Sequence, residues 1–493
     1  MLIALIDDGI DVSVIDSDLL LKHDLTVEEG GKIRERRMDE PILTDHGTTC
    51  ASIILKYAPQ AQFASLRIFH EETLEANCNM LVSALEWCLH NDIPIVHMSV
   101  GSSHLSDYSE IRRVVSKMLQ KHQMIISAHS NKDSYSIPAC LAGVFGVMAD
   151  EKMVEDEYSF GQDSNYPLGL ELKASSRHEL SWYSGYTFTT QITNSYAAPT
   201  ITAIICNMLQ EAENFFMSIP HVLRELRRKV GEGDICSHFP KPDFMAEALL
   251  FNPYGYPILK HRLFFDILEE DKVASCSSGH DLLILLPESV HCANETLCFL
   301  QENEGNYRNI LYGGRLSESS DSNLGYLVHR DDFIWTEDFL PYSYFENREE
   351  TTGKTEDSNK LCPVINIYGR DLQSLELLCQ LRDMFIDDEY QYMGVSNHRF
   401  SYLYGIEHIP NVEKKGIALD YINNMFRPDV ILCFWQQENP EIDSESDEYH
   451  VIVGTAEERE KWGYSTGTLA RNISVYFTDI SRGLYEKILE YFS

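Results

Sequence analysis

Four polar residues of this 493-residue chain could together cleave an acyl bond: Asp7, His46, Asn131 and Ser195. A serine hydroxyl attacks a carbonyl carbon when a histidine takes its proton, and a carboxylate can orient that histidine and stabilise its charged form. An asparagine amide can donate to the oxyanion that results. The residues follow the chain order Asp, His, Ser, which is one of the recurring orders of a Ser-His-Asp triad.

Each of these residues also has an ordinary structural explanation when it is considered alone. Asp7 and Asp8 precede Gly9, and Asp-Gly is typical of a turn. An isolated histidine is most often a surface or core residue, and a serine before a helix is most often its N-cap. An asparagine in a loop is most often a turn residue. The prediction of a catalytic site therefore depends on the four residues occurring together and on the elements that position them.

Those elements are predicted to belong to a doubly wound, parallel α/β sheet, because short apolar runs alternate with amphipathic stretches. The predicted strands are 3–6, 63–69, 93–100, 124–128 and 144–148, and the predicted helices are 46–58, 74–90, 108–122, 195–216 and 221–231. In open α/β sheets, reactive groups gather beyond the carboxyl ends of the strands. Asp7 and Asn131 follow two predicted strands, and His46 and Ser195 begin two predicted helices.

Five stretches within the first 215 residues resemble, in the right order, the motifs of the subtilisin-like serine proteases, or subtilases. IALIDDGID resembles the aspartate motif, HGTTCASII the histidine motif, and TNSYAAP the serine motif G-T-S-x-A-x-P. VHMSVGSS (96–103) resembles the strand that lines the primary specificity pocket, and SAHSNKD the segment that holds the oxyanion asparagine. The resemblance covers somewhat less than half of the chain.

The resemblance implies a role for each matched residue. Ser195 would be the nucleophile of a serine endopeptidase, and His46 its general base and then its general acid. Asp7 would orient His46, whereas Asp8 would serve only in the turn. Asn131, together with the backbone N–H of Ser195, would donate to the oxyanion.

The resemblance also implies an edge for peptide binding and a reaction without a cofactor. The substrate main chain would pair as an added β-strand with Ser99, Val100 and Gly101. The twelve cysteines are scattered and none forms a C-x-x-C pair, so reduced, buried thiols are expected rather than a zinc site. No metal ligands are predicted.

Three positions depart from the family pattern. Thr193 and Asn194 stand where the family has Gly-Thr before the serine, and Ser130 stands where it has glycine before the oxyanion asparagine. Glycine permits tight turns and close approach of a substrate, so these changes could narrow the cleft, demand a particular substrate, or mark a degraded enzyme. The presence of all four reactive side chains favours activity. The alternative is a weak or inactive subtilase fold that holds a peptide without cutting it.

Composition and charge restrict the partners of the chain. Its formal net charge is −37, from 77 acidic and 40 basic residues, which argues against nucleic acid. No apolar run reaches the roughly 18 residues needed to cross a bilayer. No signal peptide is visible, because an apolar strand begins at residue 2. We therefore expect a cytoplasmic protein without a pro-domain that acts on a peptide or protein, and not on a membrane.

The peptidase domain is expected to be followed by a second, smaller α/β unit. The predicted divisions are 1–220 for the peptidase domain, 221–259 for a helix and linker, 260–345 for an accessory α/β part, 346–361 for a polar linker, and 362–493 for a C-terminal α/β unit. The second half contains neither G-x-x-x-x-G-K-[ST] nor G-x-G-x-x-G, so it is expected to be non-catalytic. A role in peptide recognition for 362–493 is implied only by the resemblance to subtilases that carry an accessory domain.

This layout is similar to that of proteases that bacteria pair with ribosomally made peptides. Those enzymes remove a leader from a modified precursor peptide, and an accessory domain can recognise the leader. The predicted function is therefore that of a cytoplasmic serine endopeptidase of narrow specificity. Its substrate would be a specific peptide, for example a leader of this kind. General intracellular proteolysis is the other enzymatic possibility.

Overall fold

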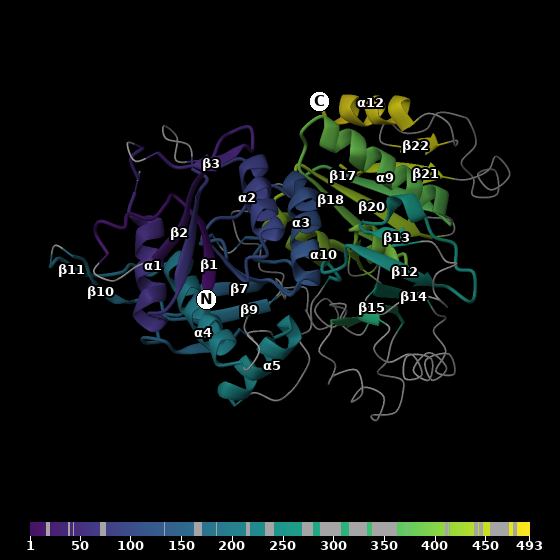
Figure 1. Ribbon diagram of the computed structural model, residues 1–493. Coiled ribbons are helices and arrows are strands. Elements are labelled where there is room, and N and C mark those ends of the chain that lie inside the picture. The colour runs from purple at the N-terminus through teal and green to yellow at the C-terminus, as the bar shows by residue number, and fades with distance from the viewer. Residues whose placement is uncertain are drawn as a thin grey trace. The chain divides into compact units, whose positions relative to one another are not determined.

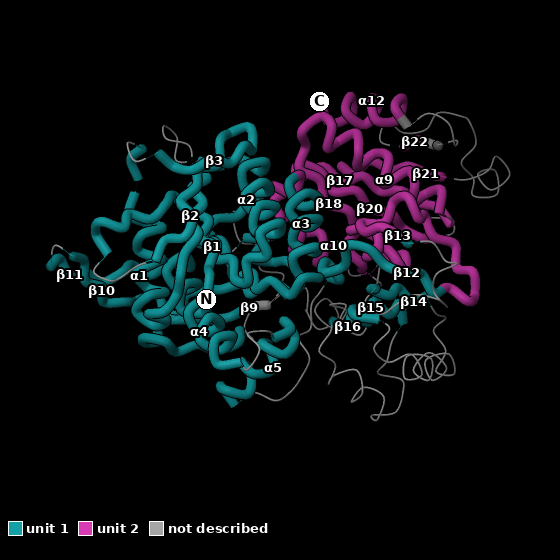
Figure 2. The backbone as a smooth tube through the Cα atoms, in the orientation of Figure 1, with its two compact units in different colours: residues 1–103, 107–251, 268–339 teal, residues 104–106, 252–267, 340–493 magenta. Residues whose placement is uncertain are grey.

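The computed structural model describes residues 1–15, 20–37, 40–42, 44–69, 75–132, 134–161, 170–183, 185–212, 217–231, 241–268, 280–285, 307–314, 333–337, 362–370, 372–409, 413, 415–437, 442, 447–453, 473–476 and 481–493. The chain divides into two compact units (Figure 2), which are 1–103, 107–251 and 268–339, and 104–106, 252–267 and 340–493. The divisions expected from the sequence fall at other residues, and the expected linker 346–361 lies outside the described residues. That division stays a prediction.

A nine-stranded sheet forms the centre of the first unit (Figure 1), in the order β3-β2-β4-β1-β5-β6-β7-β9-β8. Its strands are β1 (Leu2–Asp7), β2 (Leu20–Val27), β3 (Ile33–Glu35), β4 (Gln62–Arg67), β5 (Ile95–Met98), β6 (Met124–Ala128), β7 (Phe145–Ala149), β8 (Tyr158–Phe160) and β9 (Leu170–Ala174). Neighbours from β2 to β9 in this order are parallel, and the edge strands β3 and β8 pair antiparallel. The expected parallel α/β sheet is confirmed.

The strands that lead to the candidate residues are short and apolar. Residues 3–6 of β1 are fully buried, as in a strand that is covered on both faces. Three other predicted strands agree with β4, β6 and β7 to within two residues. The strand predicted at 93–100 is shorter than expected, because its pairing with β6 stops at Met98. Ser99, Val100 and Gly101 therefore lie beyond the strand rather than within it.

Five helices accompany this sheet: α1 (His46–Tyr57), α2 (Cys78–His90), α3 (Tyr108–Gln120), α4 (Asn194–Glu211) and α5 (Ile219–Lys229). α1 and α4 pack against each other and against the central strands, whereas α2 and α3 form a second packed pair. Figure 1 shows the two pairs on opposite sides of the sheet, as a doubly wound fold requires. Among the helices of the described residues, none is both long and apolar enough to cross a membrane.

The strands that come next in the chain after β9 form two smaller sheets. A two-stranded antiparallel hairpin, β10 (Glu179–Ser181) and β11 (Thr187–Thr189), leads into α4. A five-stranded sheet in the order β13-β12-β14-β15-β16 contains β12 (Glu247–Phe251), β13 (Asp266–Leu268), β14 (His280–Leu285), β15 (Tyr307–Gly313) and β16 (Ile334–Thr336). Pairing from β12 through β16 is parallel.

The second unit is a smaller α/β fold of its own, as the sequence predicts. Its six-stranded parallel sheet has the order β19-β18-β20-β17-β21-β22. The strands are β17 (Val364–Gly369), β18 (Tyr392–Ser396), β19 (Glu407–His408), β20 (Val430–Gln436), β21 (Tyr449–Val453) and β22 (Ile473–Tyr476). The helices within its described residues are α9 (Leu372–Asp387), α10 (Lys415–Phe426) and α12 (Ser481–Phe492). Short 3₁₀ helices described in the chain are Leu105–Asp107, Lys260–Arg262 and Ser401–Tyr404.

The described cysteines are all free thiols. Eight of the twelve lie in the described residues, and six of these eight are buried. Burial in apolar surroundings is what their positions within apolar segments predict.

Candidate active site

His46 is the first residue of α1, and its ring meets Asp7 at the carboxyl end of β1. The ring Nδ1 lies 2.8 Å from Asp7 Oδ1 and 3.0 Å from Oδ2. Asp7 is buried, whereas 31% of the His46 side chain is exposed. Because a carboxylate only accepts hydrogen bonds, Nδ1 carries the hydrogen. Nε2 is then left with a free lone pair, which is the form that can act as a base.

Charges around His46 make its imidazole more basic than usual. Burial lowers the pKa of His46, but the charge and hydrogen bond of Asp7 and then the charges of Asp8 and Asp45 raise it, and the net pKa lies above the ordinary value. An imidazolium formed at this position is therefore stabilised by neighbouring carboxylates.

Asp8 does more than form a turn, which corrects the expectation from the sequence. This buried carboxylate accepts the N–H of Gly47 at 2.8 Å and the N–H of Thr44 at 3.1 Å, and it also accepts the Thr44 hydroxyl. The N-cap residue of α1, Asp45, makes no side-chain cap. The first turn of a helix needs acceptors for its N–H groups, and Asp8 supplies one from the end of β1. Asp8 therefore fixes the helix start that carries His46.

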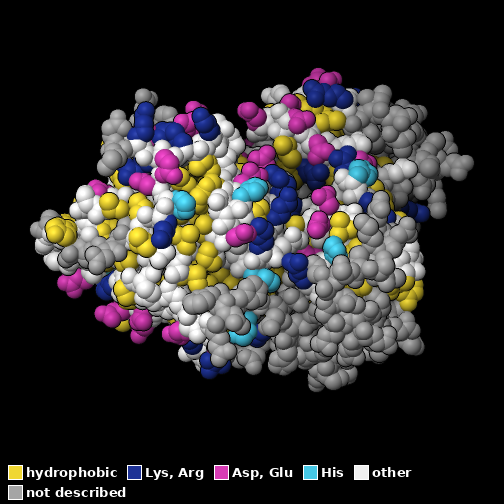
Figure 3. All heavy atoms as spheres, viewed as in Figure 1, with side chains coloured by type: hydrophobic (Ala, Val, Ile, Leu, Met, Phe, Trp, Pro, Cys, Tyr) yellow, Lys and Arg dark blue, Asp and Glu magenta, His cyan; other side chains and the backbone are white. Residues whose placement is uncertain are grey.

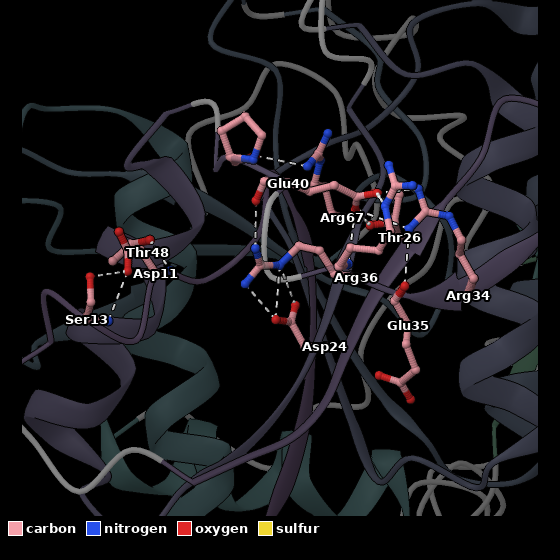
Figure 4. Close-up of polar contacts among 12 residues, drawn as sticks. Asp11, Ser13, Asp24, Thr26, Arg34, Glu35, Arg36, Glu40, Thr48 and Arg67 are labelled. Atoms are coloured by element: carbon pink, nitrogen blue, oxygen red, sulfur yellow. Dashed lines mark hydrogen bonds and ion pairs between the residues drawn. The ribbon is translucent and has the colours of Figure 1, made fainter.

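Gly47 allows that helix start to approach β1 closely. A Cβ at this position would lie 2.5 Å from Gly9 O and 2.8 Å from Asp8 Oδ1, closer than any side chain permits. One residue further on, Thr48 Oγ1 accepts the N–H of Asp11 at 2.9 Å (Figure 4). The start of α1 is therefore bound to the loop after β1 by several contacts.

The segment between β3 and α1 is also tied down, by arginines (Figure 4). The buried carboxylate of Glu40 pairs with Arg34 at 2.7 Å. Arg36 donates to the carbonyl of Glu40 at 2.8 Å, and Arg67 donates to the carbonyl of Pro41 at 3.0 Å. These bonds hold the chain five and six residues before His46.

Ser195 lies in the first turn of α4, and its carbonyl accepts hydrogen bonds from side chains of other elements. Pro199 follows four residues later and has no N–H to donate to that carbonyl. Ser99 Oγ donates to it at 3.2 Å, and Cys50 Sγ lies 3.6 Å away. The backbone of Ser195 is therefore held by α1 and by the segment after β5.

A buried histidine extends this network beneath Ser195. His97 in β5 has its Nδ1 2.8 Å from Thr202 Oγ1 and its Nε2 3.2 Å from Ser99 Oγ. Thr202 donates its own hydrogen to the Ala198 carbonyl, so it accepts from His97 Nδ1. Burial lowers the pKa of His97 to about 4, which keeps the ring neutral and makes Nε2 an acceptor for Ser99. When the Ser99 hydroxyl donates its hydrogen to His97 Nε2, the Cys50 thiol can donate to the Ser195 carbonyl instead.

The three residues expected to bind substrate main chain precede a short antiparallel bridge. Ser102 exchanges two backbone hydrogen bonds with Ile137, at 2.8 and 2.9 Å. Gly101 passes so close to Ile137 O that a Cβ would lie 2.7 Å from it. Of the three residues, Ser99 and Val100 are half-buried and Gly101 is exposed.

Asn131 is exposed, and its side chain faces the start of α4. Its Oδ1 accepts the backbone N–H of Asn194 at 3.0 Å. Thr193, the N-cap of α4, makes no side-chain cap, so the Asn131 oxygen takes over one orphan donor of the helix. Because that bond requires oxygen on the helix side, the amide NH₂ points the other way. It is the NH₂ group that a substrate oxyanion would need.

The structure joins some of the predicted site residues directly and others only through neighbours. Asp7 and His46 are in contact. The ring of Tyr196, the residue after Ser195, lies 5.4 Å from the His46 ring, centroid to centroid. His46 and Ser195, which are both described, make no hydrogen bond with each other. Such bonds are often long before substrate binds.

One cluster in the described residues has the ligand types and spacing of a metal site. It consists of Asp7, His46 and Cys50, whose ligand atoms lie within 4.8 Å of one another. Burial and then the charge of Asp7 raise the pKa of the Cys50 thiol well above its ordinary value. Since metals bind the thiolate, and His46 Nδ1 already contacts Asp7, the arrangement fits a hydrogen-bonded site better than a metal centre.

The comparison with protein families decides the identity of this domain. Residues 1–229 match the family model described as "Subtilase family". The N-terminal domain is a subtilase. The subtilase domain thus contains Asp7, His46, Asn131 and Ser195, and the family expected from the sequence motifs is confirmed.

Relatives of the subtilase domain are distant. A thermostable alkaline protease of Halalkalibacterium halodurans is 22% identical over 208 residues, which are 40% of this chain and 56% of that protein. The chain therefore spans little more than half the length of that relative. A lanthipeptide protease structure is 15% identical with a TM-score of 0.37, covering 46% of this chain and 80% of that one. The epidermin leader peptide processing serine protease of Staphylococcus aureus is 14% identical with a TM-score of 0.34, covering 46% and 68%.

We expect Asp8→Asn to shift the pH profile of Ser195 labelling, so that its acid limb lies at lower pH. The charge of Asp8 is one of the causes that raise the pKa of His46, so its removal lets His46 lose its proton at a lower pH. The rate of labelling of Ser195 by a fluorophosphonate, measured from pH 5 to 9, reports the shift. Asp24→Asn is the control, because the charge of Asp24 is already paired with Arg36 at 2.7 Å. An acid limb that stays in place or rises contradicts this role.

We expect Glu40→Gln to destabilise the domain at neutral pH. Hydrogen bonds from Arg34 are the main cause that lowers the pKa of Glu40 to about 2. Its contribution is therefore present above pH 4.5 and disappears as the pH falls toward 2. Denaturant unfolding should show a loss of about 1 kcal/mol at pH 7, as for a partly exposed ion-pair network, and a smaller loss for Glu28→Gln, which is more exposed. If Glu40→Gln and the wild type have equal free energies of unfolding at pH 7, the Glu40 carboxylate does not stabilise the domain as predicted.

Proposed function

We propose that this chain is a serine endopeptidase with Ser195 as nucleophile, His46 as general base and acid, and Asp7 as the orienting carboxylate. The observation that carries the proposal is the 2.8 Å contact between His46 Nδ1 and Asp7 Oδ1 at the end of β1. The subtilase match over residues 1–229 supports it. So does the position of Ser195 in the first turn of a helix, where the backbone favours negative charge.

In the proposed reaction, the Ser195 hydroxyl adds to the carbonyl carbon of a peptide bond. A bond forms between Oγ and that carbon, and the hydroxyl proton passes to His46 Nε2. The imidazolium then returns the proton to the leaving amine as the C–N bond breaks. A water molecule hydrolyses the acyl-enzyme by the same route. The carboxylates that raise the pKa of His46 stabilise the imidazolium in both steps.

The proposed oxyanion donors are the Asn131 amide and the backbone N–H of Ser195. The Asn131 NH₂ is directed away from α4 by the bond that its oxygen makes to Asn194, and the Ser195 N–H lies in the first turn, where it has no intrahelical acceptor. Loss of one such side-chain donor removes roughly 3–4 kcal/mol of transition-state stabilisation.

We propose that the substrate is a peptide bound in extended form along Ser99, Val100 and Gly101. Lys and Arg side chains lie among Asp and Glu side chains across the face drawn in Figure 3. A peptide bound along these three residues would be recognised through main-chain pairing rather than through charge.

The finer proposal is that the peptide is the leader of a ribosomally made, modified precursor, cut in the cytoplasm. A subtilase domain followed by a second α/β unit is the layout that motivates it. The second unit would bind the leader and so restrict cleavage to one peptide. Thr193, Asn194 and Ser130, which depart from the family pattern, are consistent with such a narrow specificity.

A tagged fluorophosphonate should label the wild-type protein and should not label Ser195→Ala. The probe reacts with an activated serine: an Oγ–P bond forms, the P–F bond breaks, and fluoride leaves. Ser218→Ala is the matched control, because Ser218 also begins a helix and caps it through His221 N–H at 3.3 Å. That variant should label at the wild-type rate. Folded wild type that stays unlabelled would instead favour a peptide-binding scaffold.

The protein should cut a precursor peptide encoded beside its own gene at a single position. The second unit would present only one segment of that peptide to Ser195. Mass spectrometry of the products, with Ser195→Ala as the control, measures the number of cuts. Degradation of unrelated, unfolded casein into many fragments at a comparable rate would argue for general proteolysis.

A further inference from the structure

Asn194, the residue before the candidate nucleophile, makes three hydrogen bonds through its side chain and so holds two separate segments. Its Nδ2 donates to the carbonyls of His129 and Ser130, each at 3.1 Å. Its Oδ1 accepts the N–H of Ala149, at the end of β7, at 2.8 Å. The residue is 9% exposed. Both amide hydrogens and the amide oxygen are used, so the side chain has only one favourable orientation.

The same residue also holds Asn131 through its backbone. The N–H of Asn194 donates to Asn131 Oδ1 at 3.0 Å. The loop that carries Asn131 is therefore bound twice: its carbonyls at 129 and 130 receive the Asn194 amide, and the Asn131 oxygen receives the Asn194 N–H. All of these bonds converge on the residue next to Ser195.

This arrangement gives a physical reason for two of the departures from the family pattern. Ser130 stands where the family has a flexible glycine, and its carbonyl is one of the two that Asn194 fixes. Ser130 is further held by its N–H, which donates to Ser136 Oγ at 3.1 Å. Ser130 is not among the described residues with a positive φ, so its backbone does not need the freedom of glycine, and these hydrogen bonds hold it in place.

We propose that Asn194 is a positioning residue that fixes the Asn131 amide relative to Ser195, and so aligns the two donors of the oxyanion site. This inference rests on the proposed function. Asn194 does not touch the substrate; it acts through Asn131 and through the loop 129–131.

Asn194→Asp tests the inference with a nearly isosteric side chain. One carboxylate oxygen still accepts the Ala149 N–H, but the other oxygen faces the carbonyls of His129 and Ser130 and repels both. The loop should shift and move Asn131. We expect the limiting rate of labelling by the fluorophosphonate to fall about 10- to 100-fold, less than the 10²- to 10³-fold that loss of the donor itself produces. The concentration of probe at half-maximal rate should stay within about threefold.

A double-mutant cycle separates positioning from mere structural damage. When Asn131→Ala has already removed the donor, Asn194→Asp should slow labelling by less than about threefold further, because two residues that act through one contact are not additive. If Asn194→Asp slows labelling equally with and without Asn131, or changes only the half-maximal concentration, the inference is wrong.

Asn207→Asp is the matched control on the same helix. Asn207 Nδ2 donates to the Tyr57 carbonyl at 2.9 Å, also across a packed interface. Asn207→Asp should lower the thermal midpoint without slowing labelling by more than about threefold. If wild type labels normally and Asn194→Asp labels equally fast, only this inference fails. If folded wild type does not label at all, both it and the proposed function fail.

Discussion

The candidate site depends on two adjacent carboxylates that are buried together at the end of β1. Asp7 and Asp8 are 1% and 2% exposed, and burial and then the charge of Asp7 raise the pKa of Asp8 to about 6. Two like charges are held there only if donors surround them. Those donors come from the start of α1: the His46 ring on one side, and the N–H groups of Thr44 and Gly47 on the other. The hydrogen bonds that stabilise the two carboxylates therefore also fix the position of α1.

The sequence predicts the parallel sheet and the chain positions of the reactive residues, because both follow from local patterns. Five apolar runs became strands, and the motif residues fall where those strands end or where helices begin. β2 and the edge strand β3 were not predicted. β2 contains Lys22, His23 and Asp24 and is flanked on one side only by the short β3, so it lacks the apolar run that marks a central strand.

The supporting contacts could not be predicted, since each joins residues that are distant in the chain. Asp8 reaches Thr44 and Gly47, and Asn194 reaches the loop 129–131, across separations that carry no local pattern. The departure at Asn194 was visible in the sequence. Its meaning was not, because a buried side-chain amide with three partners is indistinguishable in sequence from an amide in solvent.

Pro199 has a consequence that reaches beyond the helix that contains it. Because proline has no N–H, the Ser195 carbonyl lacks its intrahelical donor and accepts a hydrogen bond from Ser99, in the segment after β5. The segment proposed to receive the peptide and the residue proposed to attack it are therefore mechanically coupled through a single oxygen atom. A peptide that pairs with the backbone of Ser99 would therefore bind to a residue whose side chain already donates to the residue proposed as nucleophile.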